Sequence, residues 1–390
     1  MRSKWLSTIL VGSALIFGVS FTFASQQRPV SKPDRGDWLY VDHDHAGTRY
    51  SPLTQISTNN VSQLARVCTY SFPDKEPSQT APIVSAGIMY LTTAHYTVAL
   101  DGSDCHAIWT SKWSPRDHET LNTQRGAALA AGKIIRGTAD GFLLALDTKD
   151  GQTVCANKIA DSNKGYFISM PPLVHGDLVY IGPAGAEWAS SGWVGAFRVS
   201  DGEQVWRFNI VPRDGEPGAN TWGRDPGARK HGGGNLWTPM TFDEEKNLLY
   251  VPGGNAAPDI YDEGRPGPNL YTDSLIALDG ATGRLAWYRQ FIPHDVHDYD
   301  VTHVGPMFRT AIGGSTRDVV ASAGKDGILR LLDRDSTDIL YSVPFTSRVN
   351  AEAAVTTTPV RVCPGPFGGQ EWNGSAYNMK LDLLVVPATD

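Results

Sequence analysis

A short phrase recurs along this chain and constrains its fold more than any other feature. The copies start at Ala99, Ala145, Ala196, Ala277 and Leu331. With local variation, each has a small or apolar residue, Leu-Asp or a near variant, and a terminal Trp, Cys or Tyr, and all but the last contain Gly in between. Most copies lie roughly 50 residues apart, the length of a four-stranded propeller blade. The repeat therefore predicts an all-β propeller. Asp-x-x-x-Gly is expected to form the turn between the last two strands of each blade, and the terminal Trp to pack between neighbouring blades.

The interval between the third and fourth copies is longer than the others and holds an insertion at residues 211–234, rich in Gly, Pro and Arg. Long insertions in repeat architectures usually lie on one face and often carry function. A disordered decoration is the alternative. The motif that closes the insertion, Gly-Gly-Gly-Asn-Leu-Trp at residues 232–237, favours the functional interpretation.

Composition and charge agree with a turn-rich β protein. The 390 residues include 40 Gly, 25 Pro and 11 Trp, and only 19% are charged. That balance suits an all-β fold better than a helical one. The formal net charge of −7 argues against nucleic acid as a partner. It leaves a cation or a basic electron-transfer protein as reasonable partners.

The N-terminal residues have the pattern of a secretory signal. Arg2 and Lys4 precede an apolar run at residues 9–23, and cleavage is expected near Ala24. A membrane anchor is the alternative, but the run is shorter than the roughly 20 residues that span a bilayer. We expect export to a bacterial periplasm and no membrane span in the rest of the chain. The predicted organisation is a signal peptide at 1–24 and one partial propeller domain at 25–390.

Residues 293–300, Pro-His-Asp-Val-His-Asp-Tyr-Asp, place Asp298 and Asp300 two positions apart. If this segment is extended, alternation puts both carboxylates on one face, where they can reach one hard cation. A solvated turn is the commoner meaning of such a pair. The interpretation as a site therefore depends on the motifs elsewhere in the chain.

The chain resembles the pyrroloquinoline quinone (PQQ)-dependent alcohol dehydrogenase family, the quinoproteins related to methanol and ethanol dehydrogenases. The resemblance covers nearly all of the sequence after the signal and keeps the order of the family's motifs. The matching stretches are residues 38–64, 185–187, 232–237, 253–258, 293–300, 324–327 and 363–373. It implies an eight-bladed propeller of the quinoprotein type. It also implies a periplasmic enzyme that oxidises an alcohol or aldehyde and passes electrons to a soluble cytochrome c.

The resemblance further implies a cofactor site. PQQ is a flat orthoquinone with three carboxylates, so it needs a stacking platform, cationic partners and a Lewis acid near its reactive carbonyl. Trp237 matches the platform, Asp298 the catalytic base and Lys325 a catalytic partner of the quinone oxygens. The other matched cofactor-binding residues are Gln79, Arg125, Ser169, Gly185 and Ala186. The alternatives are a packing Trp at 237, an exposed turn Lys at 325 and a strand-edge Ser at 169.

Glu187, Asn255 and Asp298 match the family's three metal ligands, an all-oxygen set that selects a hard cation. Asp300 is a fourth candidate. Calcium-dependent members usually carry a small or neutral residue two places after the base, whereas members resembling the lanthanide-dependent branch carry Asp there. A trivalent ion gains more from a further carboxylate than a divalent one does. We therefore expect a lanthanide ion in preference to Ca2+.

Several positions depart from the family pattern. The adjacent cysteine pair of well-known members would fall at Glu119 and Thr120 and is absent. Gln79 replaces an acidic cofactor contact, His297 replaces a Trp between the two acids, and Glu371 stands where Asn is common. We expect a pocket that holds PQQ differently. An inactive or retuned relative is an open alternative.

Four cysteines occur in a chain expected to be exported: Cys68, Cys105, Cys155 and Cys363. Cys68 and Cys105 lie near the ends of consecutive blades, so a bridge between outer strands is expected. Cys155 takes the position of a blade Trp, and Cys363 is expected to be free. No Cys-x-x-Cys-His occurs in the sequence, so no covalently attached c-type haem is expected on this chain.

Residues 383–390 have the pattern of the middle of a blade. We expect about five to six of the eight blades, and an open propeller leaves two sheet edges unpaired. Either the sequence is a C-terminally truncated fragment or another chain completes the ring. Two function classes stay open. One is a periplasmic quinoprotein dehydrogenase, and the other is a non-catalytic propeller that binds a protein partner or assists envelope assembly.

Overall fold

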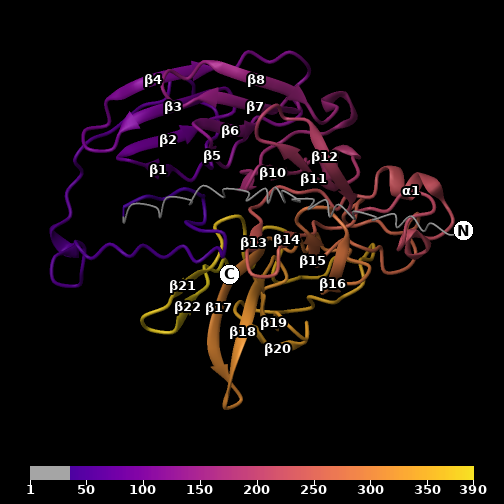
Figure 1. Cartoon of the computed structure of the whole chain (residues 1–390). Coiled ribbons are helices and arrows are strands. Elements are labelled where there is room, and N and C mark those ends of the chain that lie inside the picture. The colour runs from indigo at the N-terminus through magenta and orange to yellow at the C-terminus, as the bar shows by residue number, and fades with distance from the viewer. Residues whose placement is uncertain (1–35) are drawn as a thin grey trace, which may run out of the picture. The chain divides into compact units, whose positions relative to one another are not determined.

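The computed structural model describes residues 36–390, which belong to one compact unit. The signal peptide predicted at 1–24 lies outside the described residues. Figure 1 shows antiparallel sheets that follow one another along the chain, with short helices between them. Among residues 36–390, no helix has the length and apolar character that a bilayer crossing requires.

Residues 36–390 form five four-stranded antiparallel sheets and one two-stranded sheet, and each sheet joins strands that are consecutive in sequence. This architecture confirms the predicted all-β propeller with five to six blades. The strands are β1 (Ile83–Ser85), β2 (Ile88–Thr92), β3 (Tyr96–Asp101), β4 (Ala107–Lys112), β5 (Ala128–Ala130), β6 (Lys133–Gly137), β7 (Phe142–Asp147), β8 (Thr153–Lys158), β9 (Leu173–His175), β10 (Leu178–Ile181), β11 (Trp193–Arg198), β12 (Gln204–Asn209), β13 (Thr241–Asp243), β14 (Leu248–Pro252), β15 (Ser274–Asp279), β16 (Leu285–Gln290), β17 (His303–Ile312), β18 (Ser315–Ala323), β19 (Ile328–Asp333), β20 (Ile339–Pro344), β21 (Ala376–Asn378) and β22 (Leu383–Val385).

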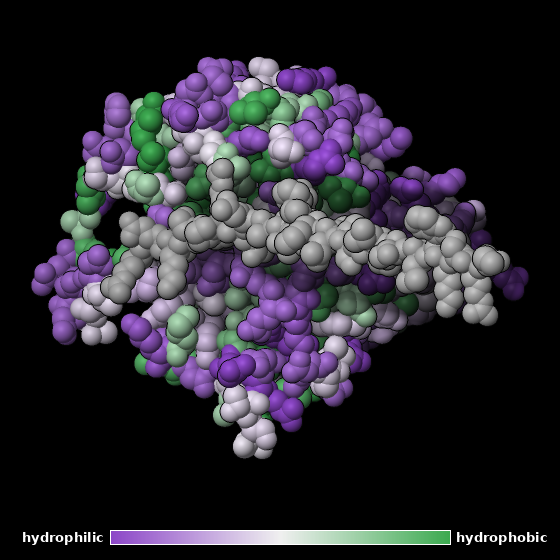
Figure 2. Space-filling model, viewed as in Figure 1, coloured by the Kyte–Doolittle hydropathy of each residue, from purple (hydrophilic) through white to green (hydrophobic). Residues whose placement is uncertain are grey.

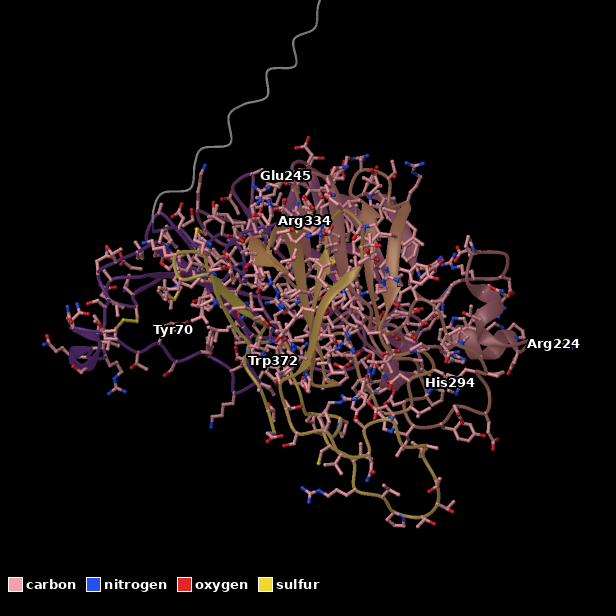
Figure 3. All side chains as sticks on the ribbon, turned by 90° about the horizontal axis from the view of Figure 1, so that it is seen from below. Tyr70, Arg224, Glu245, His294, Arg334 and Trp372 are labelled. Carbon is pink, nitrogen blue, oxygen red and sulfur yellow. A yellow bond between two sulfur atoms is a disulfide. The ribbon has the colours of Figure 1, made fainter. Side chains whose placement is uncertain are left out.

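Short helices lie outside the sheets: η1 (Val61–Gln63), η2 (Ser162–Lys164), η3 (Ala186–Trp188), η4 (Ala219–Trp222) and α1 (Pro226–Lys230). Both η4 and α1 belong to the insertion at 211–234. Trp222 is fully buried there and packs with Val211 and Ala256, while Arg224 beside α1 lies at the periphery (Figure 3). The insertion is therefore a packed part of the fold and not a disordered decoration.

The repeated phrase forms the turn between the third and fourth strands, as predicted, and a register shift lies at the same place in all five four-stranded sheets. Asp101 Oδ1 accepts a hydrogen bond from Ser103 N at 2.8 Å, and Asp279 Oδ1 accepts one from Thr282 N at 2.8 Å. Because the Asp side chain bonds a backbone N–H of its own turn, the same turn recurs wherever the phrase does.

The terminal Trp packs between neighbouring blades, as predicted. Trp109 Nε1 donates to Thr148 O at 2.8 Å, and Trp206 Nε1 donates to Gly280 O at 3.0 Å, each in the turn of the next blade. Gly151 has a φ of +70°, and a Cβ there would lie 2.5 Å from the Trp109 ring. Only Gly combines that backbone with that contact. The Trp of one blade and the Gly of the next therefore form one packing unit.

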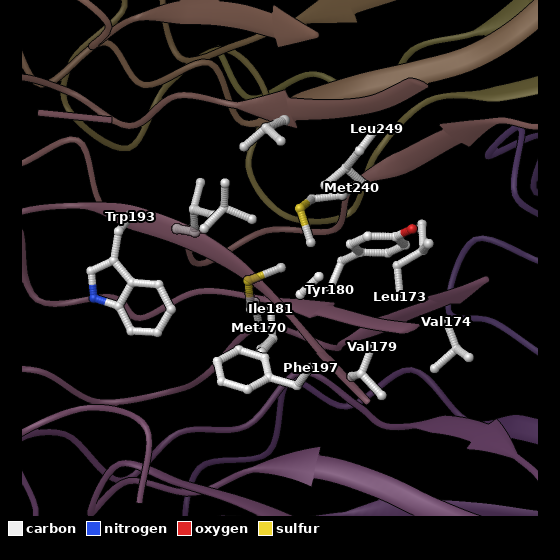
Figure 4. Close-up of a cluster of buried hydrophobic side chains, with 14 of the residues drawn as sticks. Met170, Leu173, Val174, Val179, Tyr180, Ile181, Trp193, Phe197, Met240 and Leu249 are labelled. Atoms are coloured by element: carbon white, nitrogen blue, oxygen red, sulfur yellow. The ribbon is translucent and has the colours of Figure 1, made fainter. Parts of the chain in front are cut away.

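The largest apolar cluster lies in the second to fourth blades (Figure 4). Met170, Ile181, Trp193, Phe197 and Leu249 are each at most 2% exposed. Close packing of this kind holds the loops at the blade ends in defined positions. The face shown in Figure 2 is mostly hydrophilic, with small scattered groups of apolar residues.

Residues 38–48 bridge several sheets instead of forming a blade. Trp38 and Val84 exchange two backbone hydrogen bonds of 2.8 Å at the edge of the first sheet. The other cross-connections run from Phe242 N to His45 O at 2.8 Å, from Met307 N to Ala46 O at 2.8 Å and from Tyr377 N to Thr48 O at 2.9 Å. The segment thus ties β1 to β13, β17 and β21.

Cys68 and Cys105 form a disulfide, as predicted, with their Cα atoms 5.8 Å apart. Cys68 lies between η1 and β1, and Cys105 lies in the β3–β4 turn. The expectation of a bridge between two outer strands was therefore wrong, because neither cysteine lies in a strand. Cys155 and Cys363 are free thiols.

Candidate functional site

One cavity of about 620 Å³ brings together almost all residues that the sequence proposed for the site. Ten of them line it: Gln79, Arg125, Gly185, Ala186, Glu187, Trp237, Asn255, Asp298, Asp300 and Lys325. They come from segments up to 246 positions apart in the sequence, since the first is residue 79 and the last is residue 325. The roles assigned to these residues stay predictions, but their convergence on one cavity is a structural fact.

The propeller repeat explains the convergence. Glu187, Asn255 and Lys325 each follow the second strand of a blade, β10, β14 and β18 respectively. Second strands of successive blades run in the same direction, so the loops after them meet at one end of the propeller. At Gly324 a Cβ would lie 2.6 Å from Asp300 O. Gly at this position therefore lets the backbone before Lys325 lie against Asp300.

Lys325 lies between the two carboxylates of the predicted acid pair. Its Nζ is 2.9 Å from Asp298 Oδ2 and 2.7 Å from Asp300 Oδ2. Burial alone would lower the pKa of Lys325, but the charges of Asp300 and Asp298 raise it above its ordinary value. Burial, and then the charge of Asp300, raise the pKa of Asp298. The ammonium is thus held in its charged form, and the exposed turn Lys considered for this position is excluded.

Residues 293–300 are not a strand, so the expected alternation is wrong. Asp298 adopts a φ of +63°, which turns the chain in the left-handed region. The carboxylates still converge, because Asp295 inside the same loop accepts backbone hydrogen bonds from His297 N at 3.0 Å and Tyr299 N at 2.8 Å. The hydrogen bonds to Asp295 thus determine the conformation of the loop, and strand pairing does not.

The cavity lining contains more acid than base. Five carboxylates face two cationic side chains, and the residues are Glu187, Asp259, Asp298, Asp300 and Glu371 against Arg125 and Lys325. Burial raises the pKa of Glu187 and of Asp259, and burial raises the pKa of Glu371 to about 7. Asp298 Oδ1 is buried and lacks a hydrogen-bond partner among the described residues. A cation would satisfy this surplus of negative charge and the orphaned oxygen.

The hydrogen bonds of Asn255 leave its amide oxygen available. Its backbone N–H donates to Asp300 Oδ1 at 2.8 Å, and its Nδ2 donates to Asp259 Oδ1 at 2.8 Å. Within residues 36–390, no donor bonds the Asn255 Oδ1. Since the amide nitrogen is anchored on Asp259, the oxygen can serve as a neutral ligand for a hard cation.

The two cationic side chains of the cavity both lie over the ring of Trp237. The Arg125 guanidinium carbon lies 4.8 Å from the ring centroid and the Lys325 Nζ lies 5.4 Å from it. Trp372, labelled in Figure 3, meets Trp237 edge to face at 6.4 Å, and Arg125 also lies 5.2 Å from the Trp372 ring. An aromatic face with cations beside it suits a planar anion.

Ser169 does not line the cavity. It is fully buried, and its Oγ accepts a hydrogen bond of 2.7 Å from Arg125 Nη1. Its connection to the cavity therefore runs through Arg125, whose backbone N also donates to Ser169 O at 2.9 Å. The contact with a cofactor that the sequence proposed for Ser169 stays a prediction.

Asp259, Trp188 and Trp372 are among the residues of the cavity wall that sequence reasoning missed. Asp259 follows Asn255 by four positions, and Trp188 follows Glu187 directly. Their closeness in sequence to the proposed ligands Asn255 and Glu187 could have identified both residues. Trp372 adjoins Glu371, which had been recognised only as a departure from the family pattern.

A second cavity of about 530 Å³ shares Asp259 and Asp298 with the first. Its remaining wall is largely apolar and comes from Ile260, Val296 and residues 353–366. His297 also faces it and stacks on Tyr299 at 5.1 Å. Asp298 therefore stands at the junction of a polar, acid-rich cavity and an apolar one.

Comparison with known proteins agrees with this geometry. Residues 38–361 match the PQQ family model described as glucose/ethanol/alcohol dehydrogenase, beta-propeller domain. The chain is 32% identical to a quinohemoprotein alcohol dehydrogenase from Comamonas testosteroni, over 99% of this chain and 61% of the relative. It is 30% identical to the quinohemoprotein alcohol dehydrogenase ADH IIB from Pseudomonas putida, over 90% of this chain and 56% of the relative.

Solved structures show the same likeness. The crystal structure of the Comamonas testosteroni enzyme superposes with a TM-score of 0.83 at 32% identity, covering 90% of this chain and 57% of that one. A europium-containing methanol dehydrogenase superposes with a TM-score of 0.83 at 26% identity, covering 91% of this chain and 69% of that one. The chain spans little more than half the length of the curated relatives named above.

Proposed function

This chain belongs to the PQQ-dependent glucose/ethanol/alcohol dehydrogenase β-propeller family, and we propose that its acid-rich cavity oxidises an alcohol or aldehyde with PQQ as the acceptor. One observation carries the proposal. The cavity combines an aromatic platform under two cations with a Lys-bridged pair of carboxylates. A propeller that only binds a protein partner has no need for this combination.

The residues present fit PQQ. Trp237 would support the ring plane, while Arg125 and Lys325 would bond its carboxylate and quinone oxygens. Gln79 and the backbone of Gly185 and Ala186 would complete the contacts. The cavity volume of about 620 Å³ falls within the range of roughly 300–1,000 Å³ of small-molecule sites.

The residues also fit a hard metal ion. Glu187, Asn255 and Asp298 would supply oxygen ligands, and the orphaned Asp298 Oδ1 supports this assignment. Asp300 would be the further ligand that favours a lanthanide ion over Ca2+. Both of its oxygens are engaged, Oδ1 by Asn255 N and Oδ2 by Lys325. Lys325 and the metal ion would therefore compete for Asp300.

When bound, PQQ supplies a two-electron acceptor and the metal ion supplies Lewis-acid polarisation. Asp298 acts as the general base. Its carboxylate takes the hydroxyl proton of the substrate, and its Oδ2 accepts a hydrogen bond from Lys325 Nζ. Lys325 holds the base in orientation and partly offsets the rise in its pKa, because an ammonium 2.9 Å away stabilises the carboxylate.

The apolar cavity beside Asp298 suits the organic part of the substrate. A wall of Ile260, Val296 and residues 353–366 would take an apolar carbon chain, with the hydroxyl directed at Asp298. We therefore propose a primary alcohol with a short apolar chain. Electrons would pass to a soluble cytochrome c in the periplasm, and the net charge of −7 suits a basic carrier.

Reconstitution tests this function. The protein should be freed of metal with a chelator, loaded with PQQ and either La3+ or Ca2+, and assayed with ethanol and an artificial electron acceptor. A bound-quinone absorption band and ethanol-dependent reduction of the acceptor are expected. Absence of both with either metal would overturn the proposal and favour the non-catalytic propeller.

A further inference from the structure

Three side chains with metal-binding chemistry meet far from the PQQ cavity. They are His45, His175 and Glu244, and one ligand atom of each lies within 4.8 Å of the other two. His45 belongs to the bridging segment 38–48, His175 ends β9, and Glu244 lies in the turn between β13 and β14. The cavity loops follow second strands, whereas His175 and Glu244 lie between first and second strands. The cluster is therefore at the opposite end of the blades.

The surroundings of His45 determine which ring nitrogen is free. Its Nε2 is 2.7 Å from Val174 O and 2.6 Å from Tyr40 Oη. A carbonyl oxygen only accepts, so Nε2 carries the hydrogen and donates it. In the neutral ring, Nδ1 then has a lone pair, and this nitrogen contacts Glu244 Oε1. This contact is favourable when Nδ1 carries a proton, and equally when both atoms bind one metal ion.

Glu244 is the one acid of its turn that faces the histidines. Its neighbours Asp243 and Glu245 both pair with Arg334, the latter at 3.2 Å, and Figure 3 shows Glu245 beside Arg334. Among the described residues, Glu244 pairs only with His45. Its side chain is 61% exposed, so an ion can reach it from solvent.

His175 is held by packing. Its ring stacks on Phe242 at 4.2 Å and meets His45 edge to face at 5.3 Å. Within residues 36–390, neither ring nitrogen of His175 has a protein hydrogen-bond partner. The ring is thus fixed in place while a nitrogen remains available to a ligand.

We propose that His45, His175 and Glu244 bind a divalent transition-metal ion, with zinc as the best match. Two imidazoles and a carboxylate suit borderline cations, and three protein ligands leave one position for water. The Val174 carbonyl orients His45 from behind, as outer partners of metal-bound histidines do. The site differs in chemistry from the all-oxygen set proposed in the PQQ cavity, so the two sites would select different ions.

Such an ion would cross-link the bridging segment to the third and fourth blades, next to the hydrogen bond from Phe242 N to His45 O. Binding only to the folded chain would raise its thermal stability. The site needs neither PQQ nor a substrate, so it stands independently of the proposed oxidation.

Metal titration tests the site on the full chain without PQQ. After treatment with a chelator, the protein is titrated with ZnCl2 by calorimetry and with CoCl2 by visible absorption. The variants are Glu244→Gln and His175→Ala. His294→Ala is the matched control, because His294 pairs with Asp262 at 2.9 Å in a His–carboxylate pair outside the three-residue cluster. Asp298→Asn controls for binding in the PQQ cavity.

We expect one zinc site in the parent, a Co2+ absorption band and a rise in melting temperature with zinc. Glu244→Gln and His175→Ala should each weaken binding at least about tenfold, while both controls bind as the parent does. Equal binding by Glu244→Gln and the parent, or no zinc binding by the parent, would overturn the proposal. Zinc binding lost only in Asp298→Asn would also overturn it. Glu244→Gln alters an exposed side chain and should fold. Its zinc binding therefore decides the question even if His175→Ala does not fold.

Discussion

The two ends of the blades differ in how their polar groups are satisfied. At the end with the repeated phrase, the turn acids bond backbone N–H groups of their own turns, as Asp101 and Asp279 do. At the cavity end, carboxylates outnumber cations, and Asp298 Oδ1 is buried without a partner. The comparison separates residues that stabilise the propeller from residues whose polar atoms are available to a ligand. Substitutions at the two ends should therefore affect different properties.

The largest expected effect lies at the repeat end. Trp109→Ala removes a buried ring that packs on Gly151 and bonds Thr148 O. The free energy of unfolding should fall by about 3–5 kcal/mol, measured by urea denaturation, while the folded variant still binds PQQ. Val154→Ala, at a half-exposed position of β8, should change stability by less than about 0.5 kcal/mol. A similar loss in both variants would break the distinction between packed and exposed blade positions.

At the cavity end, Asp298→Asn keeps the side-chain shape but removes the proton acceptor. The rate of alcohol oxidation by the PQQ- and metal-loaded chain should fall at least about 100-fold. Circular dichroism should show that the fold is retained. Unchanged turnover would mean that the base is another residue, and Asp259 or Glu371 would then be tested, since both line the same cavity.

Trp237→Ala removes the proposed platform. PQQ binding should weaken by about 1–3 kcal/mol, the scale of aromatic stacking with area burial, measured by absorption titration. Trp188→Ala is the matched control. Trp188 also lines the cavity, but among the described residues no cation lies over its ring. Equal losses in the two variants would contradict the assignment of Trp237 as the platform.

Asp300→Ala should have the smallest effect, because it changes metal preference and not the capacity to bind. The parent should prefer La3+ to Ca2+ in a competitive titration with PQQ present, and the variant should lose that preference while retaining weak Ca2+ binding. This difference is expected because a trivalent ion is stabilised more than a divalent ion by the further carboxylate. A parent that prefers Ca2+, or a variant with an unchanged preference, would show that Asp300 serves only Lys325 and Asn255.

The sequence predicts the repeat end well because its rules are local. A turn Asp recurs in each repeat, and a Gly with positive φ and a packing Trp recur in most of them, so their spacing can be read directly. The disulfide of Cys68 and Cys105 was predicted correctly for a related reason. Its strand context was not, because residues before Ile83 pair with no outer strand.

The cavity end could be predicted only through the resemblance. Glu187, Asn255 and Lys325 lie in loops whose meeting depends on closure of the blades around a common axis, and no local pattern encodes that. Ser169 illustrates the limit, because its Oγ faces Arg125 and not the cavity. The cluster of His45, His175 and Glu244 shows it again, since three unrelated segments supply one residue each.

The most direct test of the cofactor and metal assignments is a crystal structure of the chain with PQQ and Eu3+, with anomalous scattering to locate the ion. We expect the quinone ring to stack on Trp237 and an anomalous peak to lie within bonding distance of oxygens from Glu187, Asn255 and Asp298. A quinone bound away from Trp237, or an ion outside the ligand set in a crystal that contains both, would contradict it.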